Sequence, residues 1–248
     1  MERNVLGVKE GVMVEDIEVT RLMPRELQAV IEEIALKHQK LPTEPSMDKE
    51  TGRINPEQAG TTVNVDQSLA KVLAASPGQK IELDIVLINP QYSRQDLIKA
   101  NQIIANYTTW FHGSSARYQN ISTALKSLNN TVVWPGEVFS FNETTGPRTA
   151  ERGYLPAPII LNGGFDVDYG GGVCQVASTV YNTALIAGLP IIERHAHTKP
   201  VHYVPAGKDA TVNYGYLDLR YQNNRSGPLI IKTSMQNGRI YVEFRGEK

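Results

Sequence analysis

The single cysteine of this 248-residue chain, Cys174, lies where its thiol could do chemistry. It follows three glycines, 170–172, and falls in the first turn of a pattern of apolar residues with helical period. The first turn of a helix presents unpaired backbone N–H groups and a partial positive charge, and both favour thiolate over thiol. The sequence therefore indicates a reactive thiol, although a lone helical cysteine is more often a small buried hydrophobic residue.

Histidines and an aspartate follow the cysteine in the order that a nucleophilic thiol requires. His195 and His197 come shortly after the cysteine helix, and Asp209 comes next. In cysteine acyl-transfer enzymes a histidine takes the thiol proton, and a carboxylate orients the imidazole. We therefore predict a catalytic group of Cys174, His195 or His197, and Asp209. The spacing does not say which histidine is the base.

The same histidines have two other interpretations. On an extended strand His195 and His197 would share one face, because side chains alternate every two residues. Such a pair could bind a metal ion together with Asp209 or Cys174. It could also be a hydrogen-bonded structural pair. The preferred interpretation needs no metal and no cofactor, and the metal site remains an alternative.

Five residues near the cysteine are candidates for substrate binding. Gly171 and Gly172 allow unusual backbone dihedrals and the close approach of a ligand. Gln175 could stabilise an oxyanion through its N–H or its side chain. Arg148 and Arg152 lie in a polar, glycine-bearing loop and could hold a substrate carboxylate, as arginine forks do. The alternative for both arginines is solvated surface.

Composition excludes several classes of protein. A net charge of −1 gives no basic footprint for nucleic acid, and no run of 18 apolar residues could span a membrane. One cysteine excludes an intrachain disulfide and a multi-cysteine zinc site. The first residues lack an apolar core of signal-peptide length. We therefore expect either a cytosolic protein or a chain trimmed of its export segment.

Hydrophobic periodicity predicts an α+β fold with two domains. In residues 1–98 we expect a small α+β module, with a helix opened by Pro24, a second capped by Asp66, and one strand over 80–88. In residues 99–248 we expect a larger α+β domain with a mainly antiparallel sheet and the cysteine-bearing helix. Its clearest element is a hairpin around Asn237-Gly238, and 143–153 is expected to be a loop. Other expected elements there are helices over 117–128 and from 173 to a stop at 188, and strands over 103–111, 131–134, 137–142, 210–216 and 217–222.

With these residues laid out, the chain resembles the VanW family from about Asn106 to Phe244. The resemblance rests on four motifs in the family's order, which are Trp-Pro-Gly-Glu-Val-Phe-Ser-Phe-Asn (134–142), Gly-Gly-Gly-Val-Cys-Gln-Val-Ala-Ser-Thr (170–179), Glu-Arg-His-Ala-His (193–197) and Asp-Ala-Thr-Val-Asn-Tyr-Gly (209–215). His202 lies outside these motifs. The first half resembles the peptidoglycan-binding module that often precedes VanW domains.

The resemblance implies an association with vancomycin-resistance clusters of Gram-positive bacteria and a place outside the cell, in the envelope. It implies peptidoglycan or another cell-wall polymer as partner, no nucleic acid, and membrane contact only through an N-terminal anchor that this chain lacks. The pattern around Cys174 is also similar to the cysteine helix of transglutaminase-like and papain-like cores. The resemblance to the VanW family implies no defined reaction.

Two functional hypotheses follow from the sequence. The first is an envelope enzyme that hydrolyses or transfers a peptide amide of peptidoglycan or an envelope protein through a thioester on Cys174. The second is a non-catalytic peptidoglycan-binding protein in which the cysteine and histidines are structural. The rate of thiol alkylation at pH 6 separates them, since an activated thiol reacts faster than a free model thiol.

Overall fold

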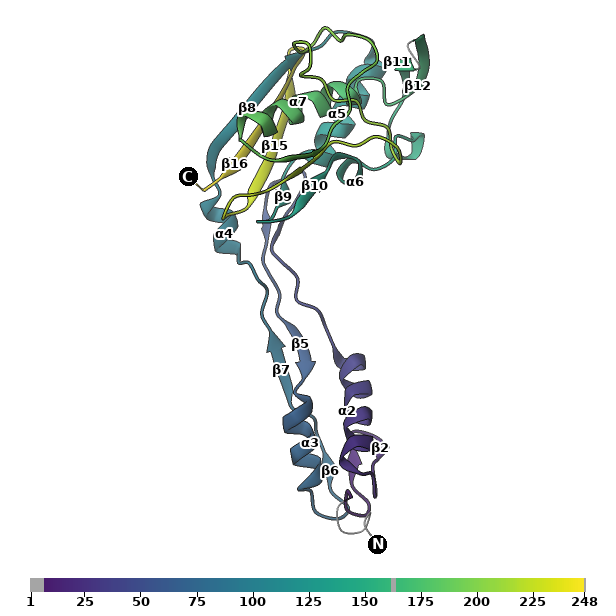
Figure 1. The fold of residues 1–248 in the computed structure, drawn as a ribbon, viewed down its shortest axis with the longest axis vertical. Coiled ribbons are helices and arrows are strands. Elements are labelled where there is room, and N and C mark those ends of the chain that lie inside the picture. The colour runs from purple at the N-terminus through teal and green to yellow at the C-terminus, as the bar shows by residue number, and fades with distance from the viewer. Residues whose placement is uncertain (1–6, 162–163, 248) are drawn as a thin grey trace. The chain divides into compact units, whose positions relative to one another are not determined.

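The computed structural model describes residues 7–161 and 164–247, and the chain forms two compact units (Figure 1). One unit comprises Met1–Pro45 and Pro56–Ser93, and the other comprises Ser46–Asn55 and Arg94–Lys248. By contact, the short hairpin 46–55 thus belongs to the second unit, and the functional division at 98/99 stays a prediction. Both units combine helices with mostly antiparallel strands, which confirms the α+β class. No helix in the described ranges is long and apolar enough to cross a bilayer.

The first unit is built on two helices, α2 (Pro24–His38) and α3 (Val65–Leu73). Its strands are β1 (Met13–Val14), β2 (Ile17–Glu18), β5 (Gly60–Val63), β6 (Lys80–Ile81) and β7 (Ile85–Ile88). Pro24 opens α2 as predicted. The cap of α3 is Asn64 and not Asp66, because the Asn64 side chain accepts the Gln67 N–H at 3.0 Å.

The single strand predicted over 80–88 is two strands in the structure. Strand β6 pairs in parallel with β1, whereas β7 pairs antiparallel with β5. The residues between them leave the sheet to bond to α3. There the Ser68 hydroxyl accepts the Asp84 N–H at 3.1 Å, and the Lys71 ammonium donates to the Glu82 carbonyl at 3.2 Å.

A four-stranded antiparallel sheet forms the centre of the second unit. Its strand order is β8 (Gln102–Trp110), β16 (Arg239–Gly246), β15 (Leu229–Gln236) and β9 (Thr131–Val133). The predicted β15–β16 hairpin is confirmed, with φ angles of 51° at Asn237 and 72° at Gly238. Two positive φ angles are what a type I′ turn requires.

Two helices, α5 (Ser115–Leu128) and α7 (Val173–Ile186), pack against one face of this sheet (Figure 1). They share a buried apolar core with the strands, to which Ile121, Val180 and Val242 contribute with no exposed surface. A buried hydrogen bond of 2.9 Å joins Thr109 of β8 to Thr179 of α7. The sheet therefore holds α7, and with it Cys174, in a fixed position.

Smaller elements complete the second unit. They are β3 (Ser46–Met47), β4 (Ile54–Asn55), α4 (Arg94–Lys99), β10 (Val138–Ser140), α6 (Phe141–Thr145), a 3₁₀ turn (Ala150–Arg152), β11 (Pro156–Leu161), β12 (Gly164–Tyr169), β13 (Ile191–Glu193) and β14 (Arg220–Gln222). The loop predicted over 143–153 is thus partly helical. Only 220–222 of the two strands predicted over 210–222 is a strand, because the chain turns between Asn213 and Leu217 at Gly215 (φ 83°).

Candidate functional site

A glycine at the start of α7 brings Cys174 into the first turn of the helix. Gly172 is the N-cap, with a left-handed φ of 109° that favours glycine. A Cβ atom on Gly172 would lie 2.9 Å from Cγ1 of Ile121, so the residue also permits the close approach of α5. Cys174 is half-buried, and part of its surface reaches solvent. The predicted placement of the thiol is therefore confirmed.

The Cys174 thiol faces the segment 197–212 rather than the apolar core alone. Its Sγ atom lies 3.6 Å from the Thr211 hydroxyl and 3.6 Å from the Val212 carbonyl oxygen. Burial raises the pKa of the thiol, but the interactions with His197, Val212 and Thr211 together lower it more, so the Cys174 pKa lies below its usual value. A thiolate is thus favoured beside the imidazole.

His197 is held between this thiol and a carboxylate. Its Nδ1 atom lies 2.7 Å from Oδ2 of Asp209, and its backbone N–H donates to the same oxygen at 2.7 Å. Burial lowers the His197 pKa, but the interactions with Cys174 and Asp209 outweigh it and raise the pKa above its ordinary value. Because Nδ1 is bonded to Asp209, Nε2 is the ring nitrogen left to interact with the sulfur. The pair therefore favours thiolate and imidazolium together.

Asp209 is itself fixed by three groups. In addition to the two bonds from His197, Arg194 donates from Nη2 to Oδ1 at 2.9 Å. The Arg194 Nε atom also donates to the Asp209 carbonyl at 2.6 Å. Burial raises the pKa of Asp209, but the hydrogen bonds from His197 hold it below its usual range. The carboxylate is thus charged and orients the imidazole at neutral pH.

Two polar residues of α7 attach the aspartate segment to the helix. The Ser178 hydroxyl accepts the Ala210 N–H at 2.8 Å and donates to the Cys174 carbonyl at 2.8 Å. The Asn182 amide donates to the Lys208 carbonyl at 2.7 Å. The first of these contacts is buried and the other two are part-buried, and together they hold the segment 208–210 beside the helix.

The His195 ring has a partner outside this group, although the His195 carbonyl accepts the Thr211 N–H at 2.8 Å. The expectation that both histidines share a strand face is wrong. Strand β13 ends at Glu193, so the two-residue alternation does not extend to His197. The Nε2 atom of His195 lies 2.9 Å from Oε1 of Glu193, which also accepts the Asp218 N–H at 2.9 Å. The structure therefore brings His197, and not His195, to the thiol.

Gln175 is occupied by other contacts and is not placed as an oxyanion donor. Its side-chain amide donates to the Trp110 carbonyl at 2.8 Å, and its N–H donates to the Gly172 carbonyl at 3.1 Å. Its Oε1 atom accepts Nη2 of Arg117 at 2.8 Å. Gln175 is buried, and its side-chain amide bonds to Thr109 and Trp110 of β8 instead of facing the thiol.

Two of the other predicted binding residues, Gly171 and Arg152, bond to neighbouring parts of the protein. The Gly171 carbonyl accepts the Asn120 amide at 3.2 Å, and Arg152 donates to the Thr145 carbonyl at 3.1 Å. The guanidinium of Arg152 lies against Gly146, where a Cβ would be 2.5 Å from its Cζ atom. Gly171 and Arg152 thus stabilise loops in this structure.

Arg148, by contrast, interacts electrostatically with the thiol. It crosses Gly170, where a Cβ would lie 2.8 Å from its Cγ atom, and its Nη1 donates to the Gly146 carbonyl at 2.9 Å. Its Nη2 is buried and has no hydrogen-bond partner among the described residues. Burial lowers the Arg148 pKa, whereas Cys174 is among the groups that raise it.

Three contributors to the site were not predicted from the sequence. Burial lowers the pKa of Arg117 in the first turns of α5, and the charges of Tyr203 and Cys174 oppose this effect. Tyr203 lies edge-on to His197 at a ring-centroid distance of 6.4 Å, and burial raises its pKa. Thr211 contacts the sulfur. Arg117 and Tyr203 lie outside the four motifs, and Thr211 lies within 209–215 but has no residue type that indicates chemistry. Helix α5 and the segment 203–211, which are far apart in sequence, supply these residues.

Within the described ranges, no group of three or more His, Cys, Asp and Glu side chains is gathered as a metal site. His195 is engaged with Glu193, and His197 is engaged with Asp209. The alternative of a metal held by both histidines and Asp209 therefore finds no support in the geometry.

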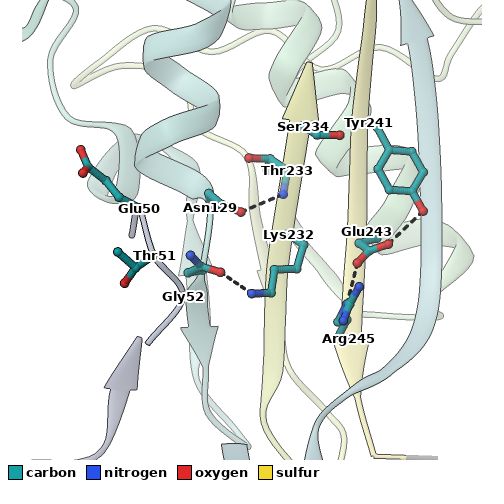
Figure 2. A pocket seen from close by; sticks show the side chains of 11 residues that line it. Glu50, Thr51, Gly52, Asn129, Lys232, Thr233, Ser234, Tyr241, Glu243 and Arg245 are labelled. Atoms are coloured by element: carbon teal, nitrogen blue, oxygen red, sulfur yellow. Dashed lines mark hydrogen bonds and ion pairs between the residues drawn. The ribbon is translucent and has the colours of Figure 1, made fainter. Parts of the chain in front are cut away.

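The second unit also has a polar hollow on its sheet, which Figure 2 shows from close by. Its volume is about 360 Å³, and two of its charged groups, Glu243 and Arg245, form an ion pair. Lys232 donates to the Asn130 side chain, while Glu243 accepts from the Tyr241 hydroxyl at 3.0 Å and from Arg245 at 2.5 Å. This hollow lies on strands β15 and β16 and has no residue in common with the thiol site.

Comparison with known proteins gives a family match over half of the chain. A family described as "VanW like protein" matches residues 116–245. An "Uncharacterized protein YoaR" of Bacillus subtilis is 39% identical over 196 residues, which cover 77% of this chain and 65% of that protein. The "Vancomycin B-type resistance protein VanW" of Enterococcus faecalis is 28% identical over 134 residues, or 52% of this chain and 49% of that protein. The chain thus spans less than two thirds of either relative, and no solved structure matches.

Proposed function

Because this chain belongs to the family of VanW-like proteins, we propose that it is a cell-envelope enzyme that transfers acyl groups through Cys174. His197 acts as the base and Asp209 orients it. The observation that carries the proposal is the chain of contacts from thiol to imidazole to carboxylate. In it the 2.7 Å bond between His197 and Asp209 leaves the opposite ring nitrogen for the sulfur.

The chemistry is that of a nucleophilic thiol acting on a peptide amide. The thiolate attacks the amide carbonyl carbon, and the resulting tetrahedral oxyanion collapses as the C–N bond breaks. The imidazolium of His197 gives its proton to the departing amine nitrogen. Water or a second amine then attacks the thioester carbonyl carbon and gives its proton to His197. The C–S bond breaks and releases the Cys174 thiolate, which restores the thiolate–imidazolium pair. Hydrolysis and transpeptidation differ only in this last acceptor.

Two donors are placed to stabilise the oxyanion. The backbone N–H of Cys174 belongs to the first helical turn, which leaves its donors unpaired, and it has no acceptor within the described part of the chain. The Arg148 guanidinium interacts electrostatically with the same cysteine. Positive charge and N–H donors near the nucleophile favour the negative charge that develops on the substrate oxygen.

Peptidoglycan is the substrate and partner that we propose, with the peptide amides of its stems as the reacting groups. One relative has a name that includes vancomycin resistance, and this name supports a role in the cell envelope. We propose on the same ground an extracellular location, attachment to the membrane, and wall binding by residues 1–98. Nucleic acid is not proposed, in keeping with the net charge of −1.

Alkylation kinetics and acyl-enzyme capture test this proposal together. At pH 6 iodoacetamide should react with Cys174 at least about tenfold faster than with a free model thiol, because one unit of pKa is tenfold in thiolate. Incubation with soluble stem peptides should add an acyl mass to Cys174, detected by mass spectrometry, and Cys174→Ser should not form that thioester. Labelling at the rate of a model thiol, with no acyl adduct, would leave the non-catalytic binding protein as the better account.

A further inference from the structure

The hollow of Figure 2, called the sheet hollow below, lies on the face of the central sheet opposite helices α5 and α7. In the β15–β16 hairpin Lys232 pairs with Glu243. Their strand neighbours Ile231 and Val242 are fully buried in the core that the strands share with the helices. Because side chains alternate along a strand, Lys232 and Glu243 project from the other face. A ligand in the sheet hollow is therefore separate from the thiol site.

One wall of the sheet hollow is the turn 48–52, between β3 and β4. The Asn130 amide fixes this turn by donating to the Asp48 carbonyl at 2.9 Å. The Thr51 hydroxyl donates to the Asp48 carboxylate at 2.6 Å. In Figure 2 the exposed Glu50 side chain points away from strands β15 and β16. The turn thus closes one side of the hollow without directing a carboxylate at the strands.

Several polar groups on the sheet side are already used by the protein. Glu243 accepts Nε of Arg245 at 2.5 Å with one oxygen and the Tyr241 hydroxyl at 3.0 Å with the other (Figure 2). The Thr233 hydroxyl donates to the Leu125 carbonyl at 2.8 Å. Glu243 is only 6% exposed, so its carboxylate is committed to these two partners and is closed to a ligand.

The groups that keep hydrogen-bonding capacity beside Glu243 are donors. Lys232 bonds to the neutral side-chain oxygen of Asn130, which takes one of its three N–H groups. Arg245 uses Nε for Glu243, and neither of its Nη atoms has a hydrogen-bond partner among the described residues. The Arg245 side chain is 38% exposed, Lys232 is half-buried, and Ser234 is exposed. A ligand can therefore reach all three donors.

Charge on the sheet side of the hollow is unbalanced. Two cations, Lys232 and Arg245, stand beside one carboxylate, Glu243, which leaves an excess of one positive charge. Burial lowers the pKa of Lys232, the charge of Arg245 lowers it further, and Glu243 opposes them by less. A ligand with one negative charge would remove this repulsion. The fork of an arginine and the ammonium of a lysine are the groups that bind oxyanions in proteins.

We propose that the sheet hollow is a binding site for an oxyanion group with a single negative charge. The ammonium of Lys232 and the Nη atoms of Arg245 bind the anionic oxygens, and the Ser234 hydroxyl donates at the rim. A peptide carboxylate and a phosphodiester both present this chemistry. The site goes beyond acyl transfer and does not rest on it, because none of these residues contacts Cys174.

Titration of the full wild-type chain with small probes tests this site. The probes are N-acetylalanine, dimethyl phosphate and the neutral N-acetylalanine amide, added to ¹⁵N-labelled protein at low salt and followed by NMR. At least one of the two anions should bind at least about fivefold more tightly than the amide, because only an anion balances the excess positive charge. The shifts should concentrate in 232–234 and 241–245, and added salt should weaken binding.

Two lysine variants locate the interaction. Lys232→Gln should weaken anion binding at least about fivefold. Lys126→Gln should leave it within about twofold, because Lys126 is exposed in the last turn of α5 and does not line the hollow. Circular dichroism checks that both variants fold, and the comparison of probes on the wild-type chain needs neither.

The two anions also distinguish the sources of the ligand. Tighter binding of dimethyl phosphate supports the site and identifies a phosphodiester, whereas tighter binding of N-acetylalanine supports it and identifies a carboxylate. Two anions that bind no more tightly than the neutral amide would overturn the proposal. Equal effects of the two lysine variants, or shifts that lie outside 232–245, would overturn it as well.

Discussion

Two carboxylate–imidazole pairs follow helix α7, and they differ in exposure and in what lies beyond the ring. In the pair of Glu193 and His195, the side chains are 31% and 38% exposed and 2.9 Å apart. In the pair of Asp209 and His197, they are 11% and 8% exposed and 2.7 Å apart. Partly exposed ion pairs contribute little to stability, whereas buried pairs strongly perturb each other's protonation.

The difference shows that tertiary position, and not sequence spacing, determines which histidine interacts with the thiol. His195 bonds to Glu193, and that carboxylate also accepts the Asp218 N–H. Glu193 and Asp218 both line a hollow between β10, α6, β13 and the turn 213–218. His197 faces Asp209, which Arg194, Ser178 and Asn182 hold beside α7 through their bonds to 208–210. The first pair therefore belongs to the wall of that hollow, whereas the second pair contributes to the lowered pKa of the Cys174 thiol.

Replacing each histidine separately is the strongest way to break this comparison. In His197→Asn the thiol loses the two interactions with the imidazole that lower its pKa, while burial still raises it and Val212 and Thr211 still lower it, so the alkylation rate at pH 6 should fall about tenfold. In the matched variant His195→Asn, the rate should stay within about twofold. The measurement is the second-order rate constant with iodoacetamide from pH 5 to 9.

The total thiol content of the two denatured variants provides the control, because each retains one cysteine. A rate that falls equally in both variants would contradict the assignment of separate roles.

The pH dependence of acyl transfer by the wild-type chain is a further prediction. Because the Cys174 pKa is lowered and the His197 pKa is raised, acyl transfer should begin to rise below the usual thiol pKa and decline only above the usual imidazole pKa.

Asp209→Asn should have a smaller effect on the thiol, of about three- to tenfold in alkylation rate at pH 6. The neutral amide no longer raises the His197 pKa, but Cys174 still does. Stability supplies the second readout. A carboxylate whose folded pKa is lowered stabilises the fold above its unfolded pKa of about 4, and this contribution disappears as pH falls through the folded value.

Urea unfolding measured from pH 7 to pH 3 should therefore show a steeper loss of stability in the wild-type chain than in Asp209→Asn. Glu243→Gln is a matched control for the loss of a buried carboxylate, since Glu243 is 6% exposed and lies in β16, away from the thiol. An unchanged alkylation rate in Asp209→Asn would mean that His197 needs no carboxylate partner.

Local signals in the sequence predicted the elements that carry the site better than the site itself. Asn237-Gly238 specifies its own turn, because both residues tolerate positive φ. The glycine run and the apolar period specify α7 and its cysteine. Each of these depends on neighbours within a few residues, which is the range over which propensities act.

The arrangement of 193–222 could not be predicted in the same way. Its backbone forms few ladder bonds and is held by side chains of α7, such as the bond from Asn182 to Lys208 across 26 positions. Gln175 turns inward because β8 leaves polar groups for it to satisfy. Long-range contacts determine that His197 bonds to Asp209, that Gln175 is buried against β8, and that Arg148 crosses Gly170. Such contacts leave no pattern in the sequence.

Ser178→Ala tests the attachment that separates the two pairs in space. Without its hydroxyl, the buried Ala210 N–H loses its acceptor, which should cost about 1–3 kcal/mol in the free energy of unfolding. The measurement is urea unfolding followed by circular dichroism. Ser234→Ala in β15 is the control, because that serine is exposed and its loss should cost less than about 0.5 kcal/mol. Equal losses would show that Ser178 does not hold Asp209 in place.

Glu193→Gln should give the smallest effect and the sharpest view of the outer pair. The hydrogen bond from His195 lowers the Glu193 pKa, but a glutamine oxygen still accepts from the Asp218 N–H, so the wall of the hollow should persist. The alkylation rate should change by less than about twofold, because no contact of Glu193 reaches the sulfur, and the free energy of unfolding should fall by less than about 1 kcal/mol. Both are measured on the same protein, with iodoacetamide at pH 6 and with urea. A large fall in the alkylation rate would mean that the two pairs are coupled through the chain between 193 and 197, and that the separation of roles argued from their distances does not hold.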